Sequence, residues 1–304
     1  MRKKILLSLI LFSLLKIGFA LKPDTTYSLK PEIYGLMYKD YKVKTKDNYL
    51  INVWFYPAQK ALSNDSMRYY FNKKTEIRPF KLSNDNKKPT IIICDGDAQN
   101  MSNPLLSFAY MYCTNGFNVI TFDWRGFGKS QYFPIDTNYL VYSEFITDYL
   151  AVIDFSTKIE TVDENRIGVF GFSTGAFLSY AVAYKSDKVK AIIARGIFTD
   201  YASIKANLIK NNPKKTYLLY PKNIDKFSPR HTWNDFSKPI FLIVGDLDET
   251  TPKKNSIEII SNVKSNVREL WIVKNAKHGG INAPEIVENK LFIKKTVRFF
   301  NENL

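Results

Sequence analysis

The pentapeptide Gly171-Phe172-Ser173-Thr174-Gly175 carries the clearest chemical signal in this sequence. It follows the largely apolar run 166–170 and precedes an alanine-rich stretch. A Gly-x-Ser-x-Gly sequence between a strand and a helix is typical of a sharp, strained turn that exposes the serine hydroxyl above a sheet. Ser173 is therefore a candidate nucleophile for attack on an acyl carbonyl. A small-residue turn without a chemical role is the alternative that the pentapeptide alone leaves open.

A serine nucleophile needs a base, because an unassisted hydroxyl reacts poorly. The chain has only two histidines. His278 lies in a glycine-containing loop directly after the apolar run 270–273, whereas His231 lies in the segment Pro229–Trp233, where no strand end is expected. The position after a strand favours His278 as the base.

A carboxylate should orient the imidazole of that base. The loop 245–252 follows the apolar run 240–244 and holds three acidic residues. We expect Asp248 to take this role, with Asp246 as the second choice and Glu249 as the third. An acidic residue at the start of a helix also serves as a cap, so one of the three could act only in that way.

The negative oxygen of an acyl-transfer intermediate needs two backbone N–H donors, which form an oxyanion hole. The N–H of Thr174, directly after the nucleophile, is the first predicted donor. The second is expected in the loop 95–100, which follows the apolar run 90–94. Gly96 allows a close approach of the backbone there, and the N–H of Asp97 is the predicted donor.

The elements that must position these residues alternate along the chain. Short, uniformly apolar strands separated by amphipathic helices predict an α/β fold with a mostly parallel sheet that is covered on both faces. An antiparallel hairpin, 33–45 and 49–57, precedes them. The expected strands are 90–94, 118–123, 166–171, 189–194, 239–245 and 268–273. The expected helices are 103–114, 139–159, 174–185, 254–263 and 285–301.

Two segments interrupt this alternation. Residues 58–88 are polar and weakly patterned, which predicts a surface insertion. Residues 197–237 are longer than a crossover helix requires and are rich in aromatic residues. A long excursion of this kind favours a lid over a pocket, and an elaborated crossover that packs only on the core is the alternative. We expect residues 21–304 to form a single domain.

Four motifs together resemble the α/β-hydrolases, in particular the serine hydrolase group of monoacylglycerol lipase-like, serine aminopeptidase-like and depalmitoylase-like proteins. The loop Asp95-Gly-Asp-Ala-Gln-Asn100 stands where that group has His-Gly-Asn-Ala-x-Asn. Asp123-Trp-Arg-Gly-Phe-Gly-Lys-Ser130 matches its Asp-Tyr-Arg-Gly-Tyr-Gly-x-Ser loop, which has a structural role. The order Ser173, Asp248, His278 is also that of the group. The resemblance covers residues 89–304 and implies a hydrolase that uses no cofactor and no metal.

The oxyanion loop departs from that pattern, because Asp95 replaces the histidine and Asp97 replaces the asparagine. Two carboxylates near a developing negative charge oppose catalysis unless they point away or pair with cations. We expect Asp95 to accept a hydrogen bond from the loop backbone or to contact Arg125.

The net charge and the N-terminal residues indicate which partners and which location to expect for this protein. The formal net charge is +15, and four of the positive charges lie within residues 1–20. The remaining lysines are scattered, which argues against nucleic-acid binding and allows at most peripheral association with membranes. The basic start, the apolar run 5–15 and the small residues before the expected cut predict a signal peptide cleaved after Ala20, and hence an exported periplasmic or secreted protein.

The two cysteines, Cys94 and Cys113, are expected to be buried thiols, with a disulfide as the alternative. The sequence as a whole predicts a serine hydrolase that cleaves a carboxylic ester through an acyl-enzyme intermediate, with a small-molecule or lipid-like acyl substrate. Thioester or peptide hydrolysis is open as well. The alternative from another class is a non-catalytic α/β-hydrolase-like protein that binds a ligand or partner in the same pocket.

Overall fold

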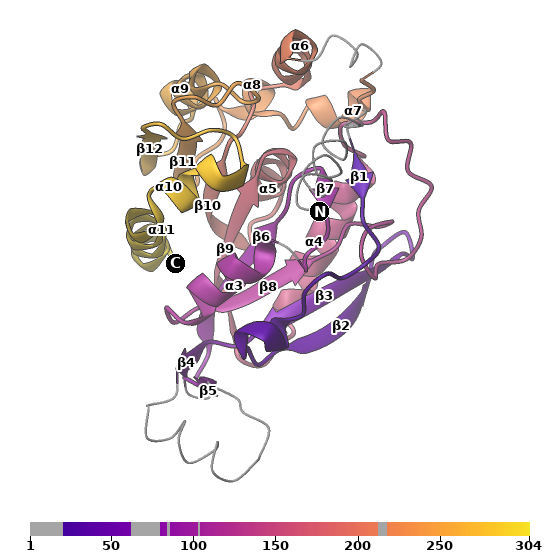
Figure 1. Cartoon of the computed structure of the whole chain (residues 1–304), viewed down its shortest axis with the longest axis vertical. Coiled ribbons are helices and arrows are strands. Elements are labelled where there is room, and N and C mark those ends of the chain that lie inside the picture. Colours follow the sequence, from indigo (N-terminus) through magenta and orange to yellow (C-terminus); the bar gives the residue numbers. More distant parts are fainter. Residues whose placement is uncertain (1–20, 62–79, 84–85, 103, 212–217) are drawn as a thin grey trace, which may run out of the picture.

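An eight-stranded sheet forms the centre of the computed structural model, which describes residues 21–61, 80–83, 86–102, 104–211 and 218–304 (Figure 1). The strand order is β12-β11-β10-β9-β6-β8-β3-β2. The six strands from β12 to β8 run parallel, and β3 and β2 are antiparallel to their neighbours. The strands are β2 (Lys39–Lys44), β3 (Leu50–Tyr56), β6 (Lys88–Cys94), β8 (Asn118–Phe122), β9 (Val162–Phe172), β10 (Val189–Arg195), β11 (Ile240–Gly245) and β12 (Arg268–Val273). The predicted α/β-hydrolase fold is confirmed.

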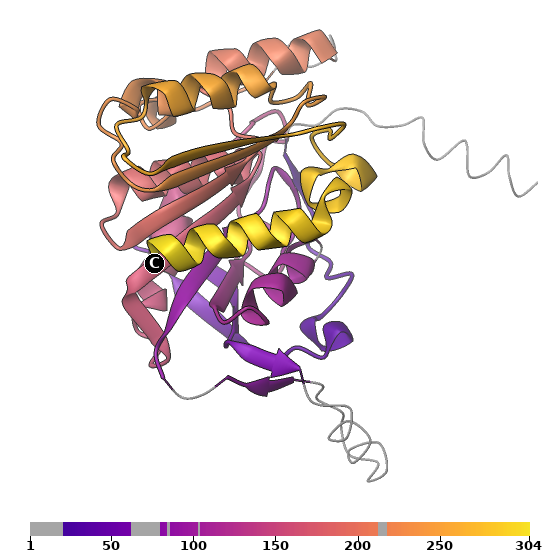
Figure 2. The ribbon, with the colours of Figure 1, turned by 90° about the vertical axis from the view of Figure 1, so that its left-hand side faces the viewer.

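Helices cover both faces of this sheet because successive side chains of each strand point to opposite sides. Along β6, Ile92 packs in one hydrophobic cluster with α4 and α5, whereas Ile91 and Ile93 pack in the other with α3 and α11. Figure 2 shows α11 lying across its face of the sheet. The long helices are α3 (Leu105–Cys113), α4 (Glu144–Ser156), α5 (Thr174–Lys185), α6 (Tyr201–Asn211), α9 (Lys253–Asn262) and α11 (Asn289–Asn303).

Several short elements complete the fold, and some of them differ from the predicted boundaries. The predicted helix 139–159 begins only at Glu144. The predicted helix 285–301 is two helices, because Glu288 leaves the helical conformation with φ −122° and ψ 44°. The short elements are β1 (Lys22–Pro23), η1 (Pro31–Tyr34), β4 (Gln59–Ala61), β5 (Phe80–Leu82), β7 (Ala98–Gln99), α7 (Lys222–Asp225), α8 (Pro229–Thr232), η3 (Gly280–Asn282) and α10 (Pro284–Val287).

The predicted insertions and leader are described only in part. The ends of the insertion 58–88 form the two-stranded sheet of β4 and β5, and the residues between these strands lie outside the described part. The predicted signal peptide, residues 1–20, also lies outside it. Within the described ranges, no helix is long and apolar enough to cross a membrane. Cys94 and Cys113 are buried free thiols, as expected.

Candidate active site

Ser173 occupies the turn between β9 and α5, and its backbone has φ 55° and ψ −121°. A positive φ is strained for a residue with a side chain, so the surrounding structure must hold it. The Ser173 N–H donates a 2.9 Å hydrogen bond to the carbonyl oxygen of Arg195 in β10. Both flanking glycines are required, because a Cβ at Gly171 would overlap the carbonyl of Gly175 and a Cβ at Gly175 would overlap the carbonyl of Asp95.

His278 and Asp248 reach this serine from the loops after β12 and β11. The Nε2 atom of His278 lies 3.0 Å from Ser173 Oγ, and its Nδ1 atom lies 2.7 Å from Asp248 Oδ2. Both distances are those of hydrogen bonds. Because the carboxyl ends of parallel strands share one edge of the sheet, three residues that are distant in sequence meet there. The structure thus brings together the three side chains selected for the triad.

The surroundings of Asp248 keep its carboxylate ionised. Burial alone would raise its pKa, but the hydrogen bond and charge of His278 and the donors of Thr251 hold the pKa below its usual value. The N–H groups of Thr250 and Thr251 donate to Oδ1 at 2.9 and 2.8 Å, and the Thr251 hydroxyl donates to Oδ2 at 2.8 Å. An ionised acid in this position can hold the imidazole with its Nε2 directed at the serine.

The alternative candidates lie elsewhere. His231 Nδ1 contacts the Ser228 hydroxyl and the Asp225 carbonyl, each at 2.9 Å, and makes no contact with Ser173. Asp246 has a buried side-chain oxygen without a hydrogen-bond partner among the described residues. Glu249 accepts a hydrogen bond through its backbone carbonyl. Neither acid contacts His278, so Asp248 is the one candidate of the three that meets the imidazole.

The loop after β6 lies against the nucleophile, where the predicted oxyanion hole is expected. A Cβ placed on Gly96 would be 3.5 Å from Ser173 Cβ, so the backbone of this loop contacts the turn. Thr174 is the first residue of α5, and an N–H at that position has no carbonyl of its own helix to bond. The role of Thr174 and Asp97 as the two donors stays a prediction.

Asp95 accepts a hydrogen bond from the backbone of its own loop, which confirms the first of the two expected arrangements. Its Oδ1 atom accepts the Gly96 N–H at 2.8 Å, and its side chain does not contact Arg125. Burial and the charge of Asp97 together raise the pKa of Asp95 to about 7, against the lowering effects of the Gly96 bond and the charge of Arg195. A carboxyl group with this pKa is partly protonated near neutral pH, which reduces the negative charge beside the nucleophile.

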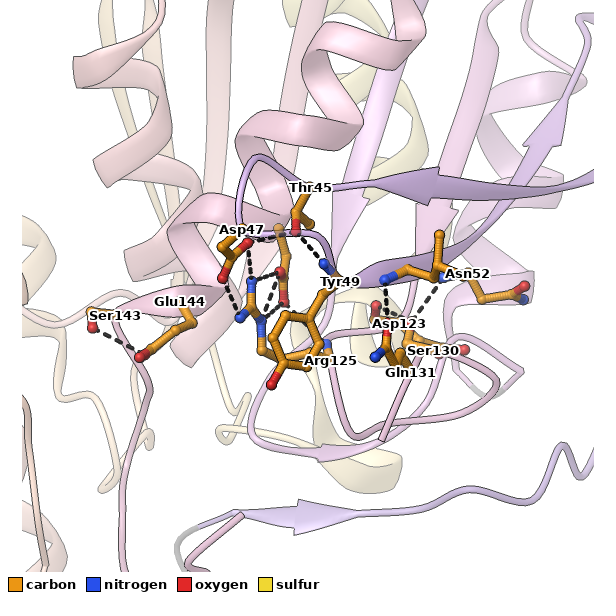
Figure 3. A network of polar contacts seen from close by, with 12 residues as sticks. Thr45, Asp47, Tyr49, Asn52, Asp123, Arg125, Ser130, Gln131, Ser143 and Glu144 are labelled. Atoms are coloured by element: carbon orange, nitrogen blue, oxygen red, sulfur yellow. Dashed lines mark hydrogen bonds and ion pairs between the residues drawn. The ribbon is translucent and has the colours of Figure 1, made fainter. Parts of the chain in front are cut away.

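Arg125, from the Asp123–Ser130 motif, joins the β2–β3 turn to α4 (Figure 3). Its guanidinium donates to Asp148 in α4 through Nε and Nη2 at 2.9 and 2.6 Å, and to Asp47 in the turn through Nη1 at 2.6 Å. It also lies 4.2 Å from the centroid of the Tyr49 ring. This motif therefore has a structural role, as the resemblance implies.

Two supporting features of the site were missed in the sequence. The first is Arg195, the last residue of β10, whose side chain is only 4% exposed. Its Nη1 donates to the carbonyl of His278 at 2.6 Å, and its Nη2 pairs with Glu285 at 2.9 Å. Its guanidinium stacks 3.6 Å above the centroid of the Phe172 ring. A charged residue at the end of an otherwise apolar strand could have indicated this role of Arg195 from the sequence.

The second missed feature is the short strand β1, which pairs with β7 within the loop 95–100. The Lys22 N–H donates to the carbonyl of Asp97 at 2.9 Å. The side-chain amide of Asn100 donates to the carbonyls of Asp24 and Thr26 at 3.0 and 2.8 Å. The two residues of β1 carry no periodicity, so sequence patterns gave no indication of this strand.

A cavity of about 340 Å³, with Gly96 and Phe172 in its walls, lies beside the turn that holds Ser173. Its walls come from the oxyanion loop, the start of α3, Phe172, Arg195 and the residues after His278. Glu285 and Ile286 of α10 also line it. None of the described residues of 197–237 belongs to these walls. The function of that segment as a lid therefore stays a prediction.

Comparisons with known proteins agree with this fold. The sequence model of the prolyl oligopeptidase family matches residues 106–304. The uncharacterized protein YfhR of Escherichia coli O157:H7 is 29% identical over 243 residues, which are 75% of this chain and 80% of that protein. An uncharacterized 31.7 kDa protein of the Escherichia coli traX-finO intergenic region is 35% identical over 114 residues, or 38% of this chain and 39% of that protein. Dipeptidyl-peptidase 5 of Porphyromonas gingivalis is 30% identical over 57% of this chain, but these residues are only 27% of that peptidase.

Among solved structures, the esterase Pf2001 of Pyrococcus furiosus matches with a TM-score of 0.70 and 21% identity, over 94% of this chain and 98% of the esterase. At that identity the likeness shows the fold. The family model covers more than half of the chain and includes Ser173, Asp248 and His278. The chain therefore belongs to the prolyl oligopeptidase family, a family of hydrolases within the α/β-hydrolase superfamily.

Proposed function

We propose that this protein is a serine hydrolase that cleaves a carboxylic ester through Ser173, His278 and Asp248. The observation that supports it most is the pair of hydrogen bonds of the imidazole, 3.0 Å to Ser173 Oγ and 2.7 Å to Asp248 Oδ2. The strained backbone of Ser173 and the close approach of the Gly96 loop agree with this role. We assign the two oxyanion donors to the N–H groups of Thr174 and Asp97.

The reaction has two steps, acylation of Ser173 and hydrolysis of the acyl-enzyme. Ser173 Oγ forms a bond to the acyl carbon while His278 Nε2 takes the hydroxyl proton, and the carbonyl electrons move onto the oxygen in the oxyanion hole. When the carbonyl reforms, the bond to the alcohol breaks and His278 gives its proton to the departing oxygen. A water molecule then repeats the sequence on the acyl-enzyme and releases the acid. Asp248 stays ionised and stabilises the imidazolium in both halves.

The ester is the favoured substrate because the group that the sequence resembles most often cleaves esters, and the aromatic-rich segment 197–237, if it is a lid, suits an apolar acyl chain. A peptide is the second candidate, and the match to the prolyl oligopeptidase family and to dipeptidyl-peptidase 5 favours it. The same triad chemistry also serves thioesters. The composition of residues 1–20 supports export after cleavage at Ala20.

A fluorophosphonate probe tests the nucleophile directly, because it reacts with an activated serine. The wild-type protein should be labelled, and the variants Ser173→Ala and His278→Ala should not. His231→Ala is the matched histidine control and should be labelled like the wild type. Equal labelling of Ser173→Ala would contradict the assignment. If no ester, thioester or aminoacyl compound in a panel is turned over and the wild type is not labelled, the non-catalytic alternative holds instead.

A further inference from the structure

Two neighbouring grooves lie along α4. The first, of about 440 Å³, lies between β2 and α4 and has Leu150 and Phe155 among its apolar walls. The second, of about 320 Å³, lies between α4 and the residues around α7 and has Leu150 and Phe227 among its walls. Lys46, Thr147 and Leu150 belong to both grooves, so the two form one surface. Six lysines border it, and we call it the lysine face: Lys42, Lys44, Lys46, Lys158, Lys185 and Lys226.

The positive charge of the lysine face is not compensated. All six lysines are exposed, and within the described ranges none of them forms an ion pair. Among the described residues, only two acidic ones line the grooves. Asp154 is already paired with Lys188 at 2.6 Å, and Glu144 accepts a hydrogen bond from Ser143 at 3.0 Å. An anionic partner is therefore the one that this surface fits.

Three of these ammonium groups lie close together. The Nζ atoms of Lys185 and Lys226 lie 4.1 and 5.0 Å from the centroid of the same Phe227 ring. Burial lowers the pKa of Lys185, and repulsion from Lys226 and Lys46 lowers it further. An anion placed among the three would relieve this repulsion, since opposite charges favour the protonated form.

The Arg125 network holds the lysine face in shape. Arg125 ties Asp47 in the β2–β3 turn to Asp148 in α4, as Figure 3 shows for the turn. Lys44 ends β2 and Lys46 lies in that turn, so the network holds the backbone of both residues relative to α4. Lys42 is held separately, because its Nζ donates to the carbonyl of Lys129 at 2.5 Å. A surface arranged before binding loses less conformational entropy when a ligand arrives.

We propose that the lysine face docks this protein on a membrane that contains anionic phospholipids. Lipid phosphates contact Lys46, Lys185 and Lys226, and the apolar side chains between the lysines face the boundary between head groups and acyl chains. Apolar walls between the lysines suit a bilayer interface better than the hydrated backbone of a nucleic acid. None of the residues that line the two grooves lines the cavity beside Ser173, so docking leaves that cavity open.

Co-sedimentation of residues 21–304, the chain that remains after the proposed cleavage at Ala20, with vesicles tests the proposal. The vesicles consist of phosphatidylcholine alone or of phosphatidylcholine with phosphatidylglycerol. The variant Lys46→Gln/Lys185→Gln/Lys226→Gln removes three charges from the lysine face. The matched control is Lys264→Gln/Lys290→Gln/Lys294→Gln, which removes three exposed lysines that line neither groove. A lysine near an anionic surface contributes roughly a fivefold gain in binding, so the first variant should bind on the order of 100-fold more weakly.

Four results would support the proposal together: binding only to the anionic vesicles, loss in the first variant, retention in the control, and weakening at high salt. Equal binding of the two variants would overturn it, as would binding to phosphatidylcholine alone. Binding of a DNA duplex with no binding to anionic vesicles would overturn it as well. Thermal melts of both variants show whether they are folded, and equal labelling of both by the fluorophosphonate probe separates this test from that of the proposed function.

Discussion

Arg195 links the nucleophile and the base of the candidate site, and its replacement by methionine tests whether that link matters. Its carbonyl accepts the N–H of Ser173, and its guanidinium donates to the carbonyl of His278. Methionine has a similar length and no charge. Arg195→Met should therefore keep the strand and release the loop that carries the imidazole.

The structure sets the size of the expected effects. The bond to the His278 carbonyl is charge-assisted, and such bonds contribute roughly 1.5–3 kcal/mol. Removal of the cation also leaves Glu285, 16% exposed, without its partner. Breaking a buried pair in this way costs roughly 3–5 kcal/mol, and partial exposure reduces that. We expect the free energy of unfolding to fall by roughly 3–5 kcal/mol in total. A shift of the imidazole on the order of 1 Å would lower kcat by about 100-fold, with a smaller change in KM.

Two further variants separate positioning from stability. Arg195→Met/Glu285→Gln removes the unpaired carboxylate and should regain part of the lost stability while kcat stays low. Arg166→Met is the matched control, because that arginine pairs with Asp163 at the other end of β9. The assays are urea unfolding and the hydrolysis of a p-nitrophenyl ester, at a temperature where all variants are folded. A double variant with the wild-type kcat would refute the positioning role.

Three more outcomes follow from the geometry of the site. Asp248→Asn should lower kcat on the order of 10³–10⁴-fold with little change in KM, because the amide can turn an N–H donor toward His278, where the imidazole needs an acceptor. The kinetics of ester hydrolysis measure this effect, and a loss below tenfold would contradict it. Asp95 has a folded-state pKa raised to about 7, so the folded protein binds the proton more tightly than the unfolded chain, and stability should fall as pH rises from about 4 to 7. In Asp95→Asn, the free energy of unfolding, measured with urea at several pH values, should fall less between about pH 4 and pH 7. An unchanged pH dependence would contradict the raised pKa of Asp95. Deletion of residues 21–26 removes the Lys22 bond to Asp97 and should reduce kcat at least tenfold, whereas full activity of the folded truncated protein would show that β1 does not order the oxyanion loop.

The sheet could be predicted because its strands are uniformly apolar and its helices are amphipathic. Each of the six expected parallel strands is present, and the hairpin appears as β2 and β3. Its first strand, predicted over 33–45, begins only at Lys39, because the chain forms η1 over Pro31–Tyr34. Boundaries were less certain where the local conformation depends on distant contacts. The stretch 139–142 resembles a helix in sequence, but Leu140 donates its N–H to the carbonyl of Leu219 and Tyr139 pairs with the same residue. These contacts hold an extended conformation that the sequence pattern does not encode.

The three triad candidates could be selected because each follows a strand of the same parallel sheet, so that topology alone brings them to one edge. The supporting residues could not be selected in this way. Arg195 donates a hydrogen bond to His278, 83 positions later in the chain, and Lys22 donates one to Asp97, in a loop that begins more than 70 positions later. Neither has a motif, since their partners are backbone carbonyls that any residue supplies. Arg125 was identified only through the Asp123–Ser130 motif, and the sequence did not indicate its partners Asp47 and Asp148.

The acidic oxyanion loop and the buried arginine bear on the same question, which is how a site with extra carboxylates can stabilise a negative oxygen. Asp95 and Glu285 line the cavity beside the nucleophile together with Arg195. Burial raises the pKa of Asp95, so this carboxyl loses much of its charge near neutral pH, and Arg195 neutralises Glu285 through their 2.9 Å ion pair. The negative charge around the proposed oxyanion hole is therefore smaller than the number of acidic residues suggests. For this reason Asp95, which replaces the histidine of the group that the sequence resembles, is compatible with hydrolysis as long as Arg195 stays paired with Glu285.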